Sequence, residues 1–477
     1  MNTRSTSSTR REHDLIGERD IPNELYYGIQ TLRAAENFHI TGVPLSHHPE
    51  IIRAFGMVKM AAAMANRDLG LLPEEIADVI IRASREMIDG QLNPHFVVDM
   101  IQGGAGTSTN MNANEVIANR GLVLLGKRRG EYEFCHPNNH VNLSQSTNDA
   151  YPTAIKIAII HANEKLLAVL HTLIDAFRAK AQEFSHVIKM GRTQLQDAVP
   201  MTLGQGFEAY AVTLSEEIER LQQNARLFLE VNMGGTAIGT GINADPEYSG
   251  KVIAYLRWTS GLEVVLSPNL VEATQDTGAF VMYSSALKRL AVKLSKICND
   301  LRLLSSGPRA GLHEINLPAM QPGSSIMPGK VNPVIPEVVN QVAFKVIGND
   351  LTVTLAAEAG QLELNVFEPV IAQSIFESIG MLSNGMETLT RQCILGITAN
   401  VDHCRRLVES SVGIVTALNP VLGYETCTRL AKEAIESDRG VYELVLEQGL
   451  LTREELDRLL APETMLKPTR IRRDTAR

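Results

Sequence analysis

The sequence predicts a mainly α-helical protein whose core is a bundle of long helices. Apolar residues recur at spacings of three and four, as on the buried face of a helix, over several long stretches. These stretches span residues 154–181, 207–231, 282–304 and 334–357. A helix of about 25 residues is about 37 Å long, and several helices of that length in one chain imply a bundle.

The stretch 282–304 shows the pattern most clearly. Lys288, Lys293 and Lys296 lie mostly off its apolar face. The face consists of Leu287, Leu290, Ala291, Leu294, Ile297, Cys298, Leu301 and Leu304. A face of this breadth needs other helices to cover it, from the same chain or from another subunit.

Three regions follow from where these stretches lie. Residues 1–147 form a mixed, mostly helical N-terminal region with a glycine-rich turn at residues 103–106. Residues 148–400 form the central long-helix region, and residues 401–477 form a small helical C-terminal region. We find no internal repeat and no low-complexity linker between them.

The composition excludes some classes of partner. A formal net charge of -9 and a pI near 5.8 argue against nucleic acid and anionic membranes. An anionic small molecule must then be captured by a local arrangement of side chains. No cysteine pair has metal-ligand spacing, which predicts reduced thiols in a cytoplasmic protein. The cysteines are Cys135, Cys298, Cys393, Cys404 and Cys427.

The N-terminal residues do not predict a secretory signal. Residues 1–14 are polar and lack the apolar centre of a secretory signal. No uninterrupted apolar run is long enough for a membrane span, so we expect a soluble protein with no membrane partner. The basic C-terminal residues are most simply a solvated end. They are Lys467, Arg470, Arg472, Arg473 and Arg477.

The segment 323–333, with the sequence GSSIMPGKVNP, is the most informative polar segment. Its glycines and prolines predict a loop, and its two serines, lysine and asparagine suit chemistry or anion binding. It is not a nucleotide phosphate loop, because five residues separate Gly323 from Gly329 and Val331 replaces the required hydroxyl. Residues 239–244 match a loose dinucleotide fingerprint, but no βαβ pattern flanks them.

Four polar segments interrupt the apolar pattern, at residues 106–112, 145–149, 191–197 and 323–333. Each is expected immediately before a helix, and three have prolines near that helix start. The prolines are Pro152, Pro200, Pro333 and Pro336. Capping of helix N-termini explains any one segment by itself.

Together, the four segments carry more hydroxyl and amide groups than capping requires, and Lys330 adds a positive charge. Helix N-termini attract carboxylates, so the set could hold a small dicarboxylate at both ends. The sequence contains no metal-ligand cluster, cofactor loop or evident Ser-His-Asp order. We therefore expect acid–base chemistry performed by the side chains themselves.

These segments resemble those of the aspartate ammonia-lyases, in the aspartase/fumarase superfamily. The resemblance extends over nearly the whole chain, and the 323–333 loop is shared across the superfamily. Residues 146–152 discriminate better, because fumarases tend to have a second serine where Thr147 stands. Further matching segments are Tyr26-Tyr27-Gly28, Thr31-Leu32-Arg33, Gly307–Gly311, Glu358–Gln361 and Glu368-Pro369.

The resemblance implies a three-domain, mainly α fold and aspartate catabolism through reversible anti elimination of ammonia from L-aspartate, which gives fumarate. Ser324 would be the general base that removes the Cβ proton. The resulting carbanion would be delocalised into the β-carboxylate as an aci-carboxylate. An alkoxide base requires loop amides and a nearby cation to lower the pKa of the hydroxyl.

The resemblance also assigns the substrate-binding residues. Lys330 and Asn332 would bind the α-carboxylate. The leaving amino group would contact Asn148, Thr193 and Gln194. Donors to the aci-carboxylate would be Thr107, Ser146, Thr147 and Ser325.

Two positions depart from the superfamily pattern. Gln194 stands where many members have histidine, and glutamine cannot titrate, so the general acid stays unassigned. Gly206 stands where relatives usually have glutamate, and the sequence gives no functional reason for the change. His140, His186 and His313 fall on no family catalytic position.

The resemblance further implies a homotetramer with a 20-helix core and active sites shared by three subunits. It implies no required cofactor or metal, although some relatives respond to a divalent cation such as Mg²⁺. The alternative functions are fumarate hydratase, with water as the leaving group, and a non-enzymatic helical scaffold. Thr147 and Gln194 argue against the hydratase, and the presence of Ser324, Lys330 and Asn332 argues against the scaffold.

Overall fold

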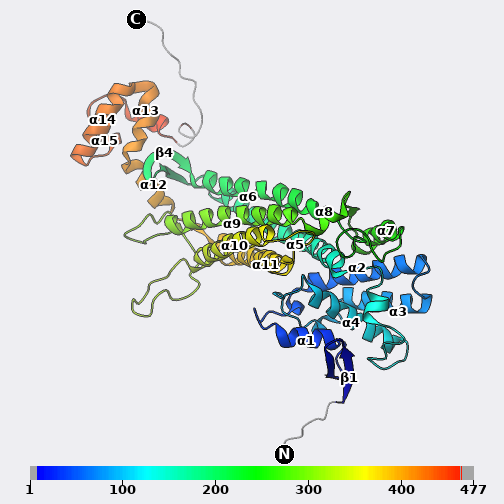
Figure 1. Ribbon diagram of the computed structural model, residues 1–477. Helices are drawn as coiled ribbons and strands as arrows, with labels where there is room; N and C mark the ends of the chain where they lie inside the picture. Colours follow the sequence, from blue (N-terminus) through cyan, green and yellow to red (C-terminus); the bar gives the residue numbers. More distant parts are fainter. Residues whose placement is uncertain (1–7, 462–463, 465–477) are drawn as a thin grey trace, which may run out of the picture. The chain divides into compact units, whose positions relative to one another are not determined.

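The computed structural model describes residues 8–461 and residue 464, and helices dominate it (Figure 1). The described chain divides into two compact units. Unit 1 comprises residues 1–168, 217–291 and 344–383, and unit 2 comprises residues 169–216, 292–343 and 384–477. The basic residues 467–477 lie outside the described part.

Five long helices contribute residues to both units. They are α5 (Thr147–Glu183), α6 (Leu203–Ala225), α9 (Gly278–Leu304), α10 (Val334–Glu358) and α11 (Glu368–Gln392). The apolar face predicted within 282–304 is confirmed on α9, where Leu287 to Leu301 of that face are buried and Leu304 is half-buried.

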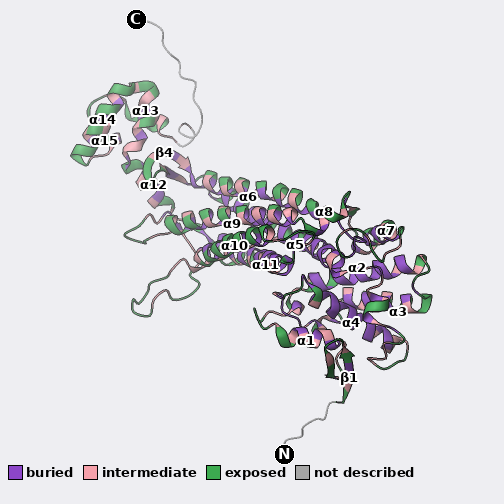
Figure 2. Ribbon diagram, viewed as in Figure 1, coloured by how far each residue is buried: buried purple, intermediate pink, exposed green. Residues whose placement is uncertain are grey.

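Unit 1 also contains six shorter helices and two small sheets. The helices are α1 (Ile29–Asn37), α2 (Pro49–Asp68), α3 (Glu74–Ile88), α4 (Thr107–Leu124), α7 (Tyr248–Ser260) and α8 (Leu270–Gln275). The strands β1 (Thr9–Asp14) and β2 (Gly17–Pro22) pair antiparallel, and β5 (Glu230–Val231) and β6 (Val265–Leu266) pair parallel. Helix α4 is buried along most of its length (Figure 2).

Unit 2 adds a hairpin and a group of short helices. Strands β3 (Ile188–Thr193) and β4 (Gln196–Thr202) form the antiparallel hairpin, and β7 (Ile315–Asn316) pairs antiparallel with β8 (Thr398–Ala399). The short helices are α12 (Val401–Ser410), α13 (Val415–Leu422), α14 (Tyr424–Ser437), α15 (Val441–Glu447) and α16 (Arg453–Leu459). These helices share a core that includes Leu418, Leu430 and Leu444.

Single helical turns complete the described secondary structure. They are η1 (Leu45–His47), η2 (Asn93–His95), η3 (Pro137–Val141), η4 (Arg226–Leu229), η5 (Ile394–Gly396) and η6 (Val412–Ile414). The three regions predicted from the sequence divide the chain by position along it, and that division stays a prediction.

Three predicted elements need correction. The helix expected to reach residue 231 ends at Ala225, because a 3₁₀ turn and β5 follow. Residues 191–197 form a hairpin turn and do not directly precede a helix, so Pro200 lies in β4. The sequence reading also missed α11, although its buried Ile371, Ile375 and Ile379 have helical spacing.

One described helix, α5, is apolar and long enough to cross a membrane by length and composition alone. The sequence reading found no such run. The most apolar window of α5 is 61% buried within the chain, so packing accounts for its apolar character.

Candidate active site

The N-terminus of α4 carries Thr107, whose side chain is exposed. The preceding Gly106 has φ +89°, and a Cβ atom there would lie 2.3 Å from the Tyr151 ring. Glycine meets both demands, since it tolerates positive φ and leaves room for the ring. Because Tyr151 belongs to α5, this close approach brings the beginnings of α4 and α5 together.

The N-terminus of α5 carries Ser146, Thr147 and Asn148. Ser146 Oγ accepts a hydrogen bond from Asn148 N at 3.2 Å, and Ser146 N donates to Asp149 Oδ1 at 2.9 Å. This reciprocal pair satisfies N–H groups that a helix start leaves without partners. Thr147 is buried, and its Oγ1 accepts from Asn110 Nδ2 of α4 at 3.1 Å.

Pro152 explains the backbone contact of Asn148. A proline inside a helix cannot donate to the carbonyl four residues before it, so the carbonyl of Asn148 needs another donor. Asn232 Nδ2 supplies it at 3.0 Å, while Asn148 Nδ2 itself donates to Ala237 O at 2.7 Å. The 232–237 loop therefore fixes Asn148 from both its backbone and its side chain.

The buried carboxylate of Asp149 holds the same loop. Its Oδ2 accepts from Gly234 N and Thr236 N, each at 3.0 Å. Burial raises the pKa of Asp149 to about 6, although its backbone N–H bonds and nearby Lys59 favour the ionised form. The carboxylate thus joins the loop to the first turn of α5.

Lys59 of α2 lies fully buried behind these helix starts. Its Nζ donates to Asn110 Oδ1 at 2.7 Å, Gln145 Oε1 at 2.9 Å and Asn142 Oδ1 at 3.1 Å. Burial lowers the pKa of Lys59 to about 7, and the Asp149 carboxylate acts in the opposite direction. The lysine is therefore the centre of a buried polar cluster in unit 1.

In unit 2, Thr193 and Gln194 lie at the exposed tip of the β3–β4 hairpin. Gln194 and Leu195 form the two-residue turn, with φ values of +53° and +62°. Such turns usually contain asparagine or glycine, because positive φ is costly for other residues. The left-handed backbone therefore concentrates local strain at a predicted substrate contact.

A buried ion-pair cluster anchors this hairpin next to its tip. Arg192 Nη1 donates to Glu314 Oε1 at 2.5 Å, and Lys189 Nζ lies 3.0 Å from Glu314 Oε2. Glu314 is fully buried, so the two cations neutralise a charge that water does not reach. Glu314 thereby fixes the strand that ends in Thr193.

The 323–333 loop organises itself around Ser324. Ser324 Oγ accepts hydrogen bonds from Ile326 N at 3.2 Å and Met327 N at 2.9 Å. Donors directed at this oxygen stabilise negative charge on it. The loop thus supplies the amide groups that a serine base requires.

Short contacts close the base of the loop. Gly323 N donates to Lys330 O at 2.7 Å, and Asn332 Nδ2 donates to Gly323 O at 2.7 Å. The side chains of Ser325 and Lys330 are exposed, whereas Asn332 is half-buried. The Asn332 amide has a structural role in this arrangement besides the predicted substrate contact.

The structure assigns the ten predicted site residues to two groups. Unit 1 brings together Thr107, Ser146, Thr147 and Asn148 at the starts of α4 and α5. Unit 2 holds the hairpin tip and the loop. The residues in unit 2 are Thr193, Gln194, Ser324, Ser325, Lys330 and Asn332.

Sequence reasoning missed the residues that position these groups. Asn110 and Asp149 lay inside segments already identified as polar, but they were assigned no role. Lys59 is a single cation within an otherwise apolar stretch of α2, a signal that could have been used. Glu314 had no local signal, because its partner Arg192 lies 122 residues away.

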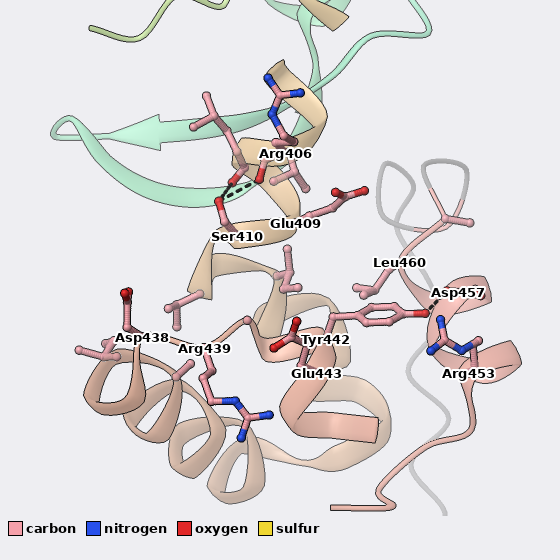
Figure 3. A pocket seen from close by; sticks show the side chains of 18 of the residues that line it. Arg406, Glu409, Ser410, Asp438, Arg439, Tyr442, Glu443, Arg453, Asp457 and Leu460 are labelled. Atoms are coloured by element: carbon pink, nitrogen blue, oxygen red, sulfur yellow. Dashed lines mark hydrogen bonds between the residues drawn. The ribbon is translucent and has the colours of Figure 1, made fainter. Parts of the chain in front are cut away.

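A separate cavity of about 1390 Å³ lies among the short helices of unit 2 (Figure 3). It is lined by charged residues of both signs, including Arg406, Glu409, Arg439 and Glu443. Tyr442 Oη donates to Asp457 Oδ1 at 2.5 Å within it. No predicted site residue lines this cavity.

Metal ligation has no evident site within residues 8–461. No group of three or more His, Cys, Asp or Glu side chains there could hold a metal ion. The five cysteines are buried and free. The rejected dinucleotide segment has a packing reason for Gly239, since a Cβ atom there would lie 2.3 Å from Leu270 O.

Two family models match this chain. The family model described as "Lyase" matches residues 17–348, and the one described as "Fumarase C C-terminus" matches residues 414–467. The first match covers more than half of the chain. The chain therefore belongs to the lyases of the aspartase/fumarase superfamily, which confirms the resemblance found in the sequence.

Within this superfamily, the curated relatives carry a more specific name. The chain is 62% identical to an aspartate ammonia-lyase from Pseudomonas canavaninivorans, over 97% of this chain and 98% of that one. It is 55% identical to an aspartate ammonia-lyase from Escherichia coli K12, over 97% of each chain.

Solved structures share the fold. The crystal structure of a fumarate lyase:delta crystallin from Brucella melitensis bound to cobalt is 57% identical, with a TM-score of 0.94. That match covers 97% of this chain and 100% of the other. A class II fumarase from Schistosoma mansoni is 34% identical, with a TM-score of 0.88 over 96% and 99% of the two chains. The predicted mainly α fold is confirmed.

Proposed function

We propose that this chain is an aspartate ammonia-lyase, an enzyme that converts L-aspartate reversibly to fumarate and ammonia. The observation that carries the proposal is the 55–62% identity to curated aspartate ammonia-lyases over nearly the full length. The polar helix starts and the serine loop supply the chemistry that this elimination requires.

Ser324 is the proposed general base. Its alkoxide takes the proton from Cβ of aspartate, and the C–H electron pair delocalises into the β-carboxylate as an aci-carboxylate. The N–H groups of Ile326 and Met327 at Ser324 Oγ support this role, because they stabilise negative charge on a hydroxyl that must lose its proton. The electron pair then forms the Cα–Cβ double bond, and the Cα–N pair leaves with the nitrogen.

The remaining predicted residues bind the substrate. We assign the aci-carboxylate to hydroxyl donors, which stabilise charge that develops during the reaction. These donors are Thr107, Ser146, Thr147 and Ser325. Lys330 and Asn332 bind the α-carboxylate through a charged and a neutral donor. Asn148, Thr193 and Gln194 contact the amino group, and Gln194 cannot deliver a proton to it.

The proposed assembly is a homotetramer with a 20-helix core, in which three subunits contribute to each active site. An exposed apolar stripe on α10 supports it. Phe344, Leu351 and Leu355 are 60–65% exposed, and Ile347 is 38% exposed on the same helix. These residues recur at helical spacing, so a neighbouring subunit could cover them together.

We further propose a cytoplasmic enzyme that requires no metal or organic cofactor. The free, buried cysteines suit a reducing compartment. Stimulation by a divalent cation, as in some relatives, is tested by adding Mg²⁺ or a chelator to the assay. Nucleic acid and membranes are not proposed as partners, given the net charge of -9.

The test is the ultraviolet absorbance of fumarate formed from L-aspartate, with L-malate assayed in parallel. Fumarate and ammonia from aspartate, with no fumarate from malate, would support the proposal. Turnover of malate alone would identify a fumarate hydratase. No turnover of either substrate would point to another amino-dicarboxylate as the substrate, or to the non-enzymatic scaffold.

A further inference from the structure

A buried polar cluster in unit 1 lies directly behind the hydroxyl of Thr147. Lys59 is its centre, and the ammonium group has three N–H donors. Three side-chain amide oxygens accept from it, at 2.7 Å for Asn110, 2.9 Å for Gln145 and 3.1 Å for Asn142. The number of acceptors equals the number of donors that a protonated lysine offers.

This arrangement fixes which way the Asn110 amide faces. A protonated lysine can only donate, so the oxygen of Asn110 faces the Lys59 ammonium group and its NH₂ group faces away. One N–H of that group donates to Asn142 Oδ1, and the other donates to Thr147 Oγ1, each at 3.1 Å. A flip of the amide would place an N–H group against the ammonium group.

The amide in turn constrains the Thr147 hydroxyl. A threonine hydroxyl has one hydrogen and can accept at its lone pairs. Because Oγ1 already accepts from Asn110, its own hydrogen must point away from Asn110. Thr147 is the first residue of α5, beside Ser146 and close to the start of α4, where we place the substrate carboxylate.

We propose that Asn110, held in one orientation by Lys59, is a positioning residue that makes the Thr147 hydroxyl a hydrogen-bond donor to the substrate carboxylate. This inference rests on the proposed function. Asn110 does not touch the substrate in this account. It sets the polarity of a hydroxyl that could otherwise present a lone pair to an anion.

The informative variant is Asn110→Asp, which is nearly isosteric. Removal of Lys59 would leave the side-chain oxygens of Asn110 and Gln145 without their donor and could prevent folding. In Asn110→Asp, a carboxylate still accepts from Lys59, so the cation keeps its partner. The carboxylate cannot donate to Thr147, however, and the hydroxyl would turn to donate to it.

We expect kcat/KM for L-aspartate to fall by about 10²- to 10³-fold in Asn110→Asp, as for loss of one donor to a developing oxyanion. The circular dichroism spectrum and the molar mass should not change. Thr147→Val should cause a similar loss. When Asn110→Asp is added to Thr147→Val, kcat/KM should fall little further, because no hydroxyl is left to orient.

Asn114→Asp is the matched control. Asn114 lies one turn further along α4 and donates to Asn142 Oδ1 at 3.0 Å, so it shares the cluster but does not contact Thr147. We expect it to retain kcat/KM within about tenfold. Equal losses of kcat/KM in Asn110→Asp and Asn114→Asp would overturn the proposal. It would also be overturned if the losses of Asn110→Asp and Thr147→Val multiplied in the double variant.

Wild-type controls separate this inference from the proposed function. If the wild-type protein releases fumarate from aspartate and Asn110→Asp does so equally well, only the positioning role fails. If the wild-type protein has no lyase activity, calorimetric titration with succinate is the readout. Weaker succinate binding by Asn110→Asp would then support the orientation of Thr147, and equal binding or no wild-type binding would overturn it.

Discussion

The buried carboxyl group of Glu115 makes stability depend on pH. Glu115 lies in α4, and its carboxylate accepts at 2.8 Å from Gly28 N, 2.9 Å from Gln30 N and 3.1 Å from Thr31 N at the start of α1. The Thr31 hydroxyl donates to it at 2.6 Å. Burial nevertheless raises the pKa of Glu115 from 4.5 to about 7, against the effect of these donors.

The direction in which stability changes with pH follows from the linkage between folding and protonation of Glu115. Between about pH 4.5 and pH 7, the folded protein keeps this proton while the unfolded chain has lost it. The stability contributed by the protonated group is complete below about pH 4.5 and is lost as the pH rises to about 7. The full change is about 3 kcal/mol, and most of it falls between about pH 5 and pH 8.5.

The variant Glu115→Gln removes the titrating group and keeps the shape of the side chain. Relative to the wild-type protein, the free energy of unfolding of the variant should rise by about 2 to 3 kcal/mol between about pH 5 and pH 8.5. Urea denaturation of both proteins at equal subunit concentration measures this difference. The difference between the two free energies of unfolding does not contain the contributions of the other titrating groups, because both proteins have them.

Asp99→Asn is a control with the opposite sign. Burial opposes ionisation of Asp99, but N–H bonds from Ile101, Thr41 and Gly42 outweigh burial and lower its pKa. Its ionised form therefore stabilises the fold at neutral pH, and this contribution is lost in acid. The wild-type advantage over Asp99→Asn should shrink as the pH falls. A difference between wild type and Glu115→Gln that is constant across pH would exclude a raised pKa for Glu115, and would mean that the four donors keep it ionised.

The remaining predictions concern the site and the assembly. Ser324→Ala should lower kcat about 10²- to 10⁴-fold with fumarate binding retained, and near-normal turnover would exclude Ser324 as the base. Lys330→Ala should raise KM for aspartate about 10- to 100-fold through loss of a charged donor, and unchanged steady-state kinetics would remove Lys330 from the site. Phe344→Glu should reduce the molar mass in light scattering and abolish activity, whereas Ile435→Glu, on the exposed face of α14, should do neither. A fully active Phe344→Glu monomer would contradict the shared-site assembly.

The long helices could be predicted because their information is local. The buried residues of α9 recur every three or four positions, and Pro333 and Pro336 stand at the start of α10. The same reasoning failed for residues 191–197. The Gln194-Leu195 turn lacks the asparagine or glycine that usually identifies a two-residue hairpin, and its anchor Glu314 is distant in sequence.

The positioning residues were hidden for a related reason. Lys59 contacts Asn110, Asn142 and Gln145, which lie 51, 83 and 86 residues further along the chain. No spacing rule joins such residues before the fold is known. The family resemblance supplied the ten site residues, whereas only the structure revealed the Lys59–Asn110–Thr147 chain of hydrogen bonds.

We propose that the enzyme makes and breaks a carbon–nitrogen bond next to an exchangeable Cβ proton. The most direct measurement is proton NMR of fumarate incubated with ammonium and the enzyme in D₂O. We expect L-aspartate that carries one deuterium at Cβ, delivered by a base that has exchanged its proton with the solvent. Formation of malate without aspartate, or fumarate that stays unchanged, would contradict it.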